Sequence, residues 1–336
     1  MDLKKLNGII KDEKPYRIKQ IQKALYCNLV SSWSEVTVLP LPLRKKLQDE
    51  APIKFDFDFV QSLEKSTFKT ILKLQDGLNV EAVLLMHKGT RNTVCVSCQA
   101  GCPMNCIFCR TARIGFKRNL EIHEIAEQVM FFSYYLKKME KKVTNIVFMG
   151  MGEPFLNYDN VIGAVRLLND KSLFGIGARK ISISTCGLPG MIEKFSGENL
   201  QVNLAVSLNA PNNALRAHLM PSNSKYPLEK LIGAVKKYTE KTGRRVMFEY
   251  VLIGGLNDSA QLALELAKLL KGLLCFVNLI PFNGKMKMKP PSPIKINEFK
   301  MVLEREHIAV TQRYDFGNDI NAACGQLVYS SGAGGL

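Results

Sequence analysis

From residue 93 onward, short apolar runs alternate with amphipathic stretches along the chain. The apolar runs are rich in β-branched residues, which favours strands. Between the runs, as in 122–136 and 228–238, apolar residues recur at steps of three and four, the period of a helix. We expect strands at 93–99, 144–150, 180–187, 202–210, 245–255 and 275–283. Such alternation predicts parallel strands joined by right-handed crossovers.

The number of strand–helix units predicts an α/β fold built as a partial barrel. Near-continuous apolar strands indicate burial on both faces. A closed barrel needs eight units, whereas this pattern supplies six. In such folds the active site lies at the carboxyl ends of the strands, so residues at these ends are the first candidates.

The residues before the barrel are expected to form two smaller parts. Ile18, Ile21 and Leu25 fall at helical spacing in a basic stretch, which predicts a small N-terminal helical accessory domain over 1–55. Residues 56–92 are predicted to be a β-hairpin linker, because Asp76-Gly77 separates two apolar runs. We expect the barrel domain over 93–328 and a flexible tail over 329–336.

Composition narrows the class of protein. The chain has 336 residues, with 46 Lys and Arg against 30 Asp and Glu, for a net charge of +16. A protein this basic is usually drawn to a polyanion, most often nucleic acid. No apolar stretch is long enough to cross a membrane, and the charged start is unlike a signal peptide. These features favour a cytoplasmic protein.

Cysteine gives the sharpest chemical signal. Nine cysteines in a chain without an export signal argue against a disulfide framework and for metal binding or thiol chemistry. Cys102, Cys106 and Cys109 form a C-x3-C-x2-C array just after the first barrel strand. Zinc could use this array with Cys98 as a fourth ligand. The alternative is an iron–sulfur cluster held by three thiolates, which leaves one iron open to a ligand.

Polar or glycine residues at five strand ends suggest a cofactor crevice. Each residue alone would more often be a turn or capping residue, but five such ends in one α/β array favour a binding site. The candidates for cofactor binding are Gly152, Glu153, Ser184, Ser207, Leu208, Asn209 and Asn283.

Seven segments of the chain resemble, in order, the RlmN/Cfr family of radical S-adenosylmethionine (SAM) RNA methyltransferases. The resemblance runs from about residue 14 to residue 328 and is most like the RlmN branch. The segments are VCVSCQAGCPMNCIFCRTARIGFKRNL, VFMGMGEPFLNYDNV, ISISTCG, NLAVSLNAPN, LMPSNSKYPL, FVNLIPFN and DINAACGQL. The fold that it implies is a partial (β/α)6 barrel with an N-terminal accessory domain.

The resemblance also implies cofactors and roles for named residues. Cys102, Cys106 and Cys109 would hold a [4Fe-4S] cluster whose open iron binds SAM. Cys324 would carry the methyl group as an S-methylcysteine, Cys95 would resolve the adduct through a transient disulfide, and Glu81 would accept a proton. Members of the RlmN branch methylate C2 of an adenine in 23S rRNA and of an anticodon-loop adenine in tRNA. We therefore expect both RNAs as partners, together with a one-electron reductant such as flavodoxin or ferredoxin, and we expect a monomer.

Some positions depart from the family pattern, and alternatives stay open. Cys98 and Cys186 stand where the family commonly has serine or another small residue, and Tyr314-Asp315-Phe316 replaces more basic residues near Cys324. The nearest alternative is Cfr-like methylation of C8, which gives antibiotic resistance. A zinc-stapled, non-catalytic RNA-binding protein and a radical SAM enzyme acting on a small molecule are more distant alternatives.

Overall fold

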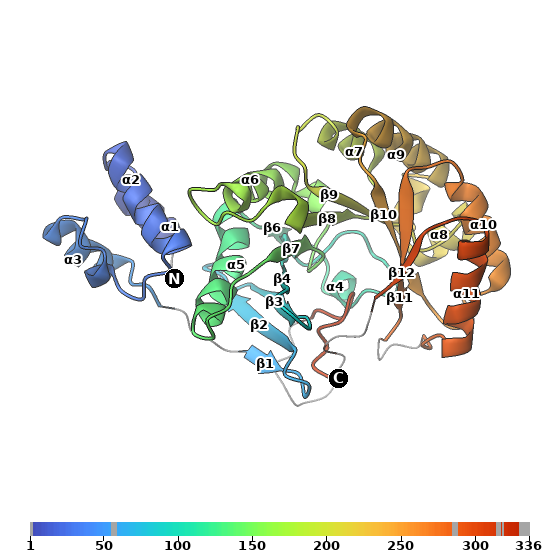
Figure 1. Ribbon diagram of the computed structural model, residues 1–336, viewed down its shortest axis with the longest axis horizontal. Coiled ribbons are helices and arrows are strands. Elements are labelled where there is room, and N and C mark those ends of the chain that lie inside the picture. The colour runs from blue at the N-terminus through green and yellow to red at the C-terminus, as the bar shows by residue number, and fades with distance from the viewer. Residues whose placement is uncertain (1–2, 55–58, 284–287, 314–316, 318, 329–336) are drawn as a thin grey trace.

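A single mixed sheet organises the chain, and helices follow its outer curve (Figure 1). The computed structural model describes residues 3–54, 59–283, 288–313, 317 and 319–328. The strand order is β1-β2-β3-β4-β7-β8-β9-β10-β11-β12, and β5 and β6 form a separate pair. The strands are β1 (Phe59–Gln61), β2 (Thr67–Lys73), β3 (Asn79–Met86), β4 (Asn92–Cys95), β5 (Gln99–Ala100), β6 (Arg118–Asn119), β7 (Asn145–Phe148), β8 (Ile181–Thr185), β9 (Asn203–Ser207), β10 (Val246–Leu252), β11 (Cys275–Pro281) and β12 (Val310–Gln312).

Helices connect the strands and form the N-terminal part. The α-helices are α1 (Leu3–Ile10), α2 (Pro15–Gln22), α3 (Leu41–Glu50), α4 (Arg110–Arg113), α5 (Ile122–Lys137), α6 (Tyr158–Asn169), α7 (Pro189–Phe195), α8 (Asn213–Leu219), α9 (Leu228–Thr242), α10 (Ala260–Leu270) and α11 (Pro293–Arg305). Shorter helical turns are η1 (Lys23–Cys27), η2 (Trp33–Glu35), η3 (Pro154–Leu156), η4 (Ala178–Lys180) and η5 (Pro221–Ser224).

Within the large sheet, the strands from β4 onward run parallel, as the alternating pattern predicts. The pairs β4–β7, β7–β8, β8–β9, β9–β10 and β10–β11 are all parallel, so the six predicted strands and the partial barrel are confirmed. A further strand, β12, adds to the far edge beside β11. The sequence did not predict β12, because it is short and partly exposed and so lacks an apolar run.

The predicted hairpin extends the sheet on its other side. β2 and β3 pair antiparallel around the Asp76-Gly77 turn, where Gly77 has a φ of 83°. The Asp76 Oδ1 atom accepts a hydrogen bond from Leu78 N at 3.1 Å, which closes the turn. β3 in turn pairs antiparallel with β4. The hairpin is therefore part of the barrel sheet, which it joins at β4, the first strand of the barrel.

The N-terminal helices have a hydrophobic core of their own. Trp33 is fully buried, and its Nε1–H donates to the carbonyl of Ala51 at 2.8 Å. Met130 and Tyr134 of α5 join this core, and Tyr134 Oη donates to the carbonyl of Val30 at 2.9 Å. The N-terminal part is thus seated on the first barrel helix (Figure 1). Among the described residues, no helix is both long enough and apolar enough to span a bilayer.

Candidate active site

The carboxyl ends of the parallel strands surround a cavity of about 130 Å³. The residues that line it come from the loop after β4 and from the ends of β7, β8, β9 and β10. They include Cys102, Cys106, Cys109, Gly152, Glu153, Ser184, Cys186, Ser207, Asn209, Glu249 and Cys324. Most of the residues predicted from strand ends therefore meet at one place.

The cysteine loop is held in a tight path by its backbone. Gly101 has a φ of 80°, and a Cβ atom there would lie 1.7 Å from the carbonyl oxygen of Gly115, so only glycine fits this crossing. Asn105 adopts the left-handed conformation between the first two cysteines, with a φ of 55°. The backbone N–H of Ile107 donates to the Leu219 carbonyl at 3.1 Å, which ties the loop to α8.

The three cysteines of this loop present a donor set that suits a metal centre. Burial raises the pKa of Cys102 and of Cys109, because a thiolate loses its hydration inside the protein. A buried group of thiolates therefore needs positive charge, which a bound centre supplies. Within the described ranges, no three His, Cys, Asp or Glu side chains converge as ligands of one ion would. Three thiols are one fewer than the four ligands that close a structural zinc site, so this donor set fits a cluster that keeps one iron open.

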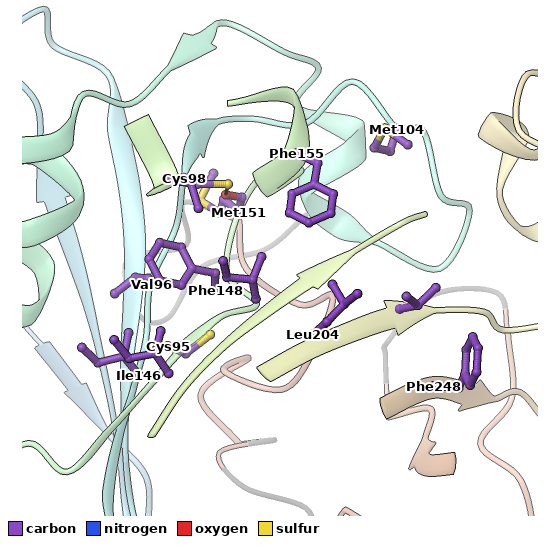
Figure 2. Close-up of a cluster of buried hydrophobic side chains, with 14 of the residues drawn as sticks. Cys95, Val96, Cys98, Met104, Ile146, Phe148, Met151, Phe155, Leu204 and Phe248 are labelled. Carbon is purple, nitrogen blue, oxygen red and sulfur yellow. Dashed lines mark hydrogen bonds between the residues drawn. The ribbon is translucent and has the colours of Figure 1, made fainter. Parts of the chain in front are cut away.

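Cys98 does not belong to this group. Its thiol points to the carbonyl oxygen of Met151, with an Sγ–O distance of 3.6 Å, and it is not among the residues that line the cavity. Figure 2 shows Cys98 beside Met151, within the buried apolar cluster. This placement argues against the four-cysteine zinc staple, which requires Cys98 as a ligand.

Cys186 brings a further thiol to the cavity wall. It follows β8 and hydrogen-bonds with Cys106, and this bond and burial raise its pKa. The sequence marked Cys186 only as a departure from the family pattern. Its place beside one of the three predicted ligands makes it a candidate for a further donor to that set.

Glu153 is held at the end of β7 by a set of donors. It is 1% exposed, and its carboxylate accepts hydrogen bonds from Thr185 Oγ1 at 2.6 Å, Cys186 N at 2.7 Å and Phe155 N at 3.0 Å. Burial raises its pKa, and these hydrogen bonds oppose the rise. Gly152 next to it has a φ of 103°, and a Cβ atom there would lie 2.6 Å from the Gln99 Cβ atom. Close packing against Gln99 therefore requires glycine at this point.

Ser184 and Ser207 converge on a carboxylate that the sequence reasoning missed. Ser184 Oγ donates to Glu249, and Ser207 Oγ lies 3.4 Å from the same oxygen, Oε2. Glu249 is a buried residue of β10 that faces the cavity. The available signal was a charged residue within the apolar run of this strand.

Leu208 and Asn209 shape the end of β9 rather than presenting free polar groups. Leu208 is fully buried, and its backbone N–H donates to the Glu249 carbonyl at 2.9 Å. Asn209 lines the cavity, but its Oδ1 atom accepts from Val251 N at 2.8 Å. Below them, the buried Arg216 donates to the carbonyls of Leu208, at 3.2 Å, and Cys186, at 2.6 Å. These bonds fix the ends of β8 and β9 relative to each other.

A smaller cavity of about 40 Å³ adjoins the first and contains the predicted pair of reactive thiols. Cys95, Asn283, Arg313 and Cys324 all line it. Cys324 also lines the larger cavity, so it faces both spaces. The structure places Asn283 in this second cavity, apart from the other cofactor candidates that line the first.

The C-terminal segment that carries Cys324 is tied to the cysteine loop. Arg110 N donates to the Gly325 carbonyl at 2.7 Å, and Thr111 Oγ1 donates to the Leu327 carbonyl at 2.8 Å. Arg313, which the sequence reasoning did not identify, donates from Nη1 to Cys324 Sγ at 2.9 Å. Tyr314-Asp315-Phe316 and the tail 329–336 lie outside the described residues.

Glu81 is buried near these thiols but lines neither cavity. Strand register pairs Val83 with Cys95, and Glu81 is two residues from Val83, so the three side chains share one face of the sheet. Lys69 Nζ lies 3.0 Å from Glu81 Oε1, and both side chains are almost fully buried. Burial raises the pKa of Glu81, whereas Lys69 lowers it.

Basic residues flank the site, but they are not equally available to a ligand. Arg113 and Lys117 are exposed beside the cysteine loop. Arg118 is occupied instead, because it forms ion pairs with Asp76 and, at 2.7 Å, with Glu124. The exposed members are the better candidates for phosphate contacts.

Comparison with known proteins decides the family. Residues 96–267 match the model of the radical SAM superfamily. The chain is 46% identical to a probable dual-specificity RNA methyltransferase RlmN from Dictyoglomus turgidum, over 94% of this chain and 91% of that protein. It is 42% identical to the ribosomal RNA large subunit methyltransferase N of Nitrosopumilus maritimus, over 93% of this chain and 92% of that protein.

The chain belongs to the RlmN family of radical SAM methyltransferases. A crystal structure of a radical SAM methyltransferase from Sphaerobacter thermophilus has the same fold, with a TM-score of 0.90 and 44% identity over 97% of each chain. Membership confirms the predicted family and the enzyme class, and it implies a [4Fe-4S] cluster and SAM as cofactors. The RlmN relationship also does not favour the Cfr-like alternative.

The bonds around Glu153 generate a stability prediction. In Glu153→Gln, an amide N–H₂ would replace one acceptor oxygen and face either the donors of Thr185 and Phe155 or the backbone N–H of Cys186. We expect the free energy of unfolding to fall by about 1–3 kcal/mol, the usual cost of leaving a buried polar group unsatisfied. Chemical denaturation measures this change. Glu306→Gln, at an exposed position, is the control; equal stabilities for the two variants would show that the Glu153 bonds contribute nothing.

Proposed function

We propose that this enzyme methylates C2 of the peptidyl-transferase-centre adenine of 23S rRNA and of an anticodon-loop adenine of tRNA. The observation that carries the proposal is the position of Cys324, which faces both the thiol-lined cavity and the pocket that contains Cys95. A methyl carrier needs access to a methyl donor on one side and to a resolving thiol on the other. The names of the RlmN relatives and the net charge of +16 support RNA as the substrate.

We assign Cys102, Cys106 and Cys109 as the residues that hold the cluster, and the strand ends around Glu153, Ser184 and Ser207 as the SAM site. When bound, these cofactors supply a carbon-centred radical through one-electron cleavage of SAM. Glu153 offers its carboxylate to the ammonium group of SAM, and Gly152 lines the cavity beside it. Asn283, in the second cavity, would contact the part of SAM nearest to Cys324.

Cys324 performs the first protein step, because C2 of adenine is too weak a nucleophile to displace a methyl group from a sulfonium. The Cys324 thiolate attacks the methyl carbon, so a sulfur–carbon bond forms as the sulfonium carbon–sulfur bond breaks. After hydrogen-atom abstraction, the carbon on Cys324 adds to the adenine and joins protein to RNA. The adduct must give up one electron, which the cluster would take back. Cys95 then attacks the sulfur of Cys324, so a sulfur–sulfur bond forms as the sulfur–carbon bond breaks, and the released carbon takes a proton to become the methyl group. Glu81 takes the proton that the adenine carbon must lose.

RNA binding is assigned to basic surfaces outside the cavity. The N-terminal helical domain and the exposed Arg113 and Lys117 would grip RNA through its phosphates while one base is unstacked. The reaction needs a one-electron reductant such as flavodoxin or ferredoxin. The proposal places the enzyme in the cytoplasm, with its RNA substrates, as a monomer.

Nucleoside analysis tests the proposed reaction directly. Full-length, cluster-loaded enzyme is incubated anaerobically with a 23S rRNA fragment, a reductant and SAM labelled in the methyl group. We expect 2-methyladenosine to carry the label, with 8-methyladenosine at background level. Dominant 8-methyladenosine would support the Cfr-like alternative, and unlabelled RNA would overturn the proposed function. Transfer RNA in a parallel reaction tests dual specificity.

Substitution of Cys95 separates its role from that of a small buried residue. Cys95→Ala leaves no thiol to release the adduct, so we expect a protein–RNA species that resists denaturation and migrates slowly in a gel. Cys98→Ala, three residues away and also buried, is the matched control and should release methylated RNA normally. Normal turnover by Cys95→Ala would show that another group resolves the adduct. Cys324→Ala should form neither adduct nor product.

A further inference from the structure

The thiol pocket contains a cation. Arg313 follows β12, which the sequence reasoning did not predict, and it lines the smaller cavity together with Cys95 and Cys324. Its backbone N–H donates to the Leu279 carbonyl at 2.9 Å, which fixes the start of the segment against β11. From this anchor its Nη1 atom reaches Cys324 Sγ at 2.9 Å. This guanidinium therefore donates a hydrogen bond to the sulfur that we propose as the methyl carrier.

The charge of Arg313 is not neutralised by an ion pair within the described part of the chain. Its other side-chain contact there is with Met149 Sδ, at 3.9 Å. Arginine stays protonated in proteins. Arg313 is half-buried, and a charge that is partly removed from water without a counter-ion is costly. An anion on the neighbouring sulfur would remove that cost. The geometry therefore suits an arginine–thiolate pair better than an arginine beside a neutral thiol.

The surroundings of Cys324 other than Arg313 disfavour a thiolate there. Burial and Glu249 of β10 raise the pKa of Cys324, whereas Arg313 lowers it. Cys95 of β4 faces the same guanidinium: burial and Cys324 raise the pKa of Cys95 to about 12, and Arg313 opposes this rise. Two thiols thus compete for one positive charge, so the pocket favours one thiolate at a time.

We propose that Arg313 is a positioning residue that holds Cys324 as an oriented thiolate, ready to accept a methyl group. This inference rests on the proposed function, because it assigns Arg313 to the first thiol step of that reaction. The thiol proton passes to water before the methyl donor binds, and the thiolate lone pair then forms the new sulfur–carbon bond. Methylation leaves a neutral thioether. The guanidinium is then free to stabilise the Cys95 thiolate for the later release.

The test measures thiolate reactivity, without RNA or turnover. Full-length, cluster-loaded protein is treated anaerobically with iodoacetamide over a series of pH values, and peptide mass spectrometry gives the alkylation rate of each cysteine. We expect Arg313→Met to slow Cys324 alkylation at neutral pH about tenfold, because each unit of pKa corresponds to a tenfold change in thiolate population below the pKa. The midpoint of the pH profile should move upward. Cys27, which is exposed and remote, is the internal reference and should not change.

Further variants distinguish charge from packing. Arg313→Lys keeps a positive charge and should retain most of the wild-type rate, whereas Arg305→Met, at an exposed position on α11, should match wild type. If Arg313→Met fails to fold, Arg313→Gln carries the same test. An unchanged midpoint in a folded, uncharged variant would overturn the proposal. Failure of the proposed function is separate, because it would appear as wild-type enzyme that makes no methyladenosine while its alkylation profile stays dependent on Arg313.

Discussion

A buried thiolate needs a positive charge beside it, and this requirement governs the whole site. Burial raises the pKa of Cys95, Cys102, Cys109 and Cys324 alike. In the proposed reaction the cluster irons meet this need for the loop cysteines, and Arg313 meets it for Cys324. The two sources of charge lie on either side of Cys324, which lines both cavities. The chemistry of one sulfur is thereby linked to two separate electrostatic environments.

The fold brings these groups together from distant parts of the chain. The cysteine loop leaves β4, crosses Gly115 at a point where only glycine fits, and is anchored to α8. The C-terminal segment returns past β12 and binds to the first residues of α4 through Arg110 and Thr111. β12 and these two contacts hold Cys324 beside a loop more than two hundred residues earlier in sequence. Through these anchors the fold places the proposed methyl carrier beside the proposed cluster site.

The amino-acid sequence predicted those strands and turns that follow from the local order of apolar, polar and turn-forming residues. The strands from 93 to 283 and the Asp76-Gly77 hairpin follow from apolar periodicity and turn chemistry, and the structure confirms them. β12 escaped prediction because its residues are partly exposed and its strand character comes from pairing with β11. Glu249 escaped because its importance arises from facing Ser184, which is 65 residues away in sequence. Arg313 escaped because no motif marks it, and only the fold directs its side chain to Cys324. Asn283 was expected beside Glu153, but the path of the chain after β11 places it near Cys324.

The central claim is that one iron of the cluster has no protein ligand, and Cys186, beside Cys106, is the group that most directly challenges it. Mössbauer spectroscopy of protein reconstituted with ⁵⁷Fe, with and without SAM, measures this. We predict that SAM makes one iron of the four distinct, and does so equally in wild type and in Cys186→Ala. The contradicting result is a wild-type spectrum that SAM does not change, together with a distinct iron that appears only in Cys186→Ala. That result would show that Cys186 is the fourth protein ligand of the cluster.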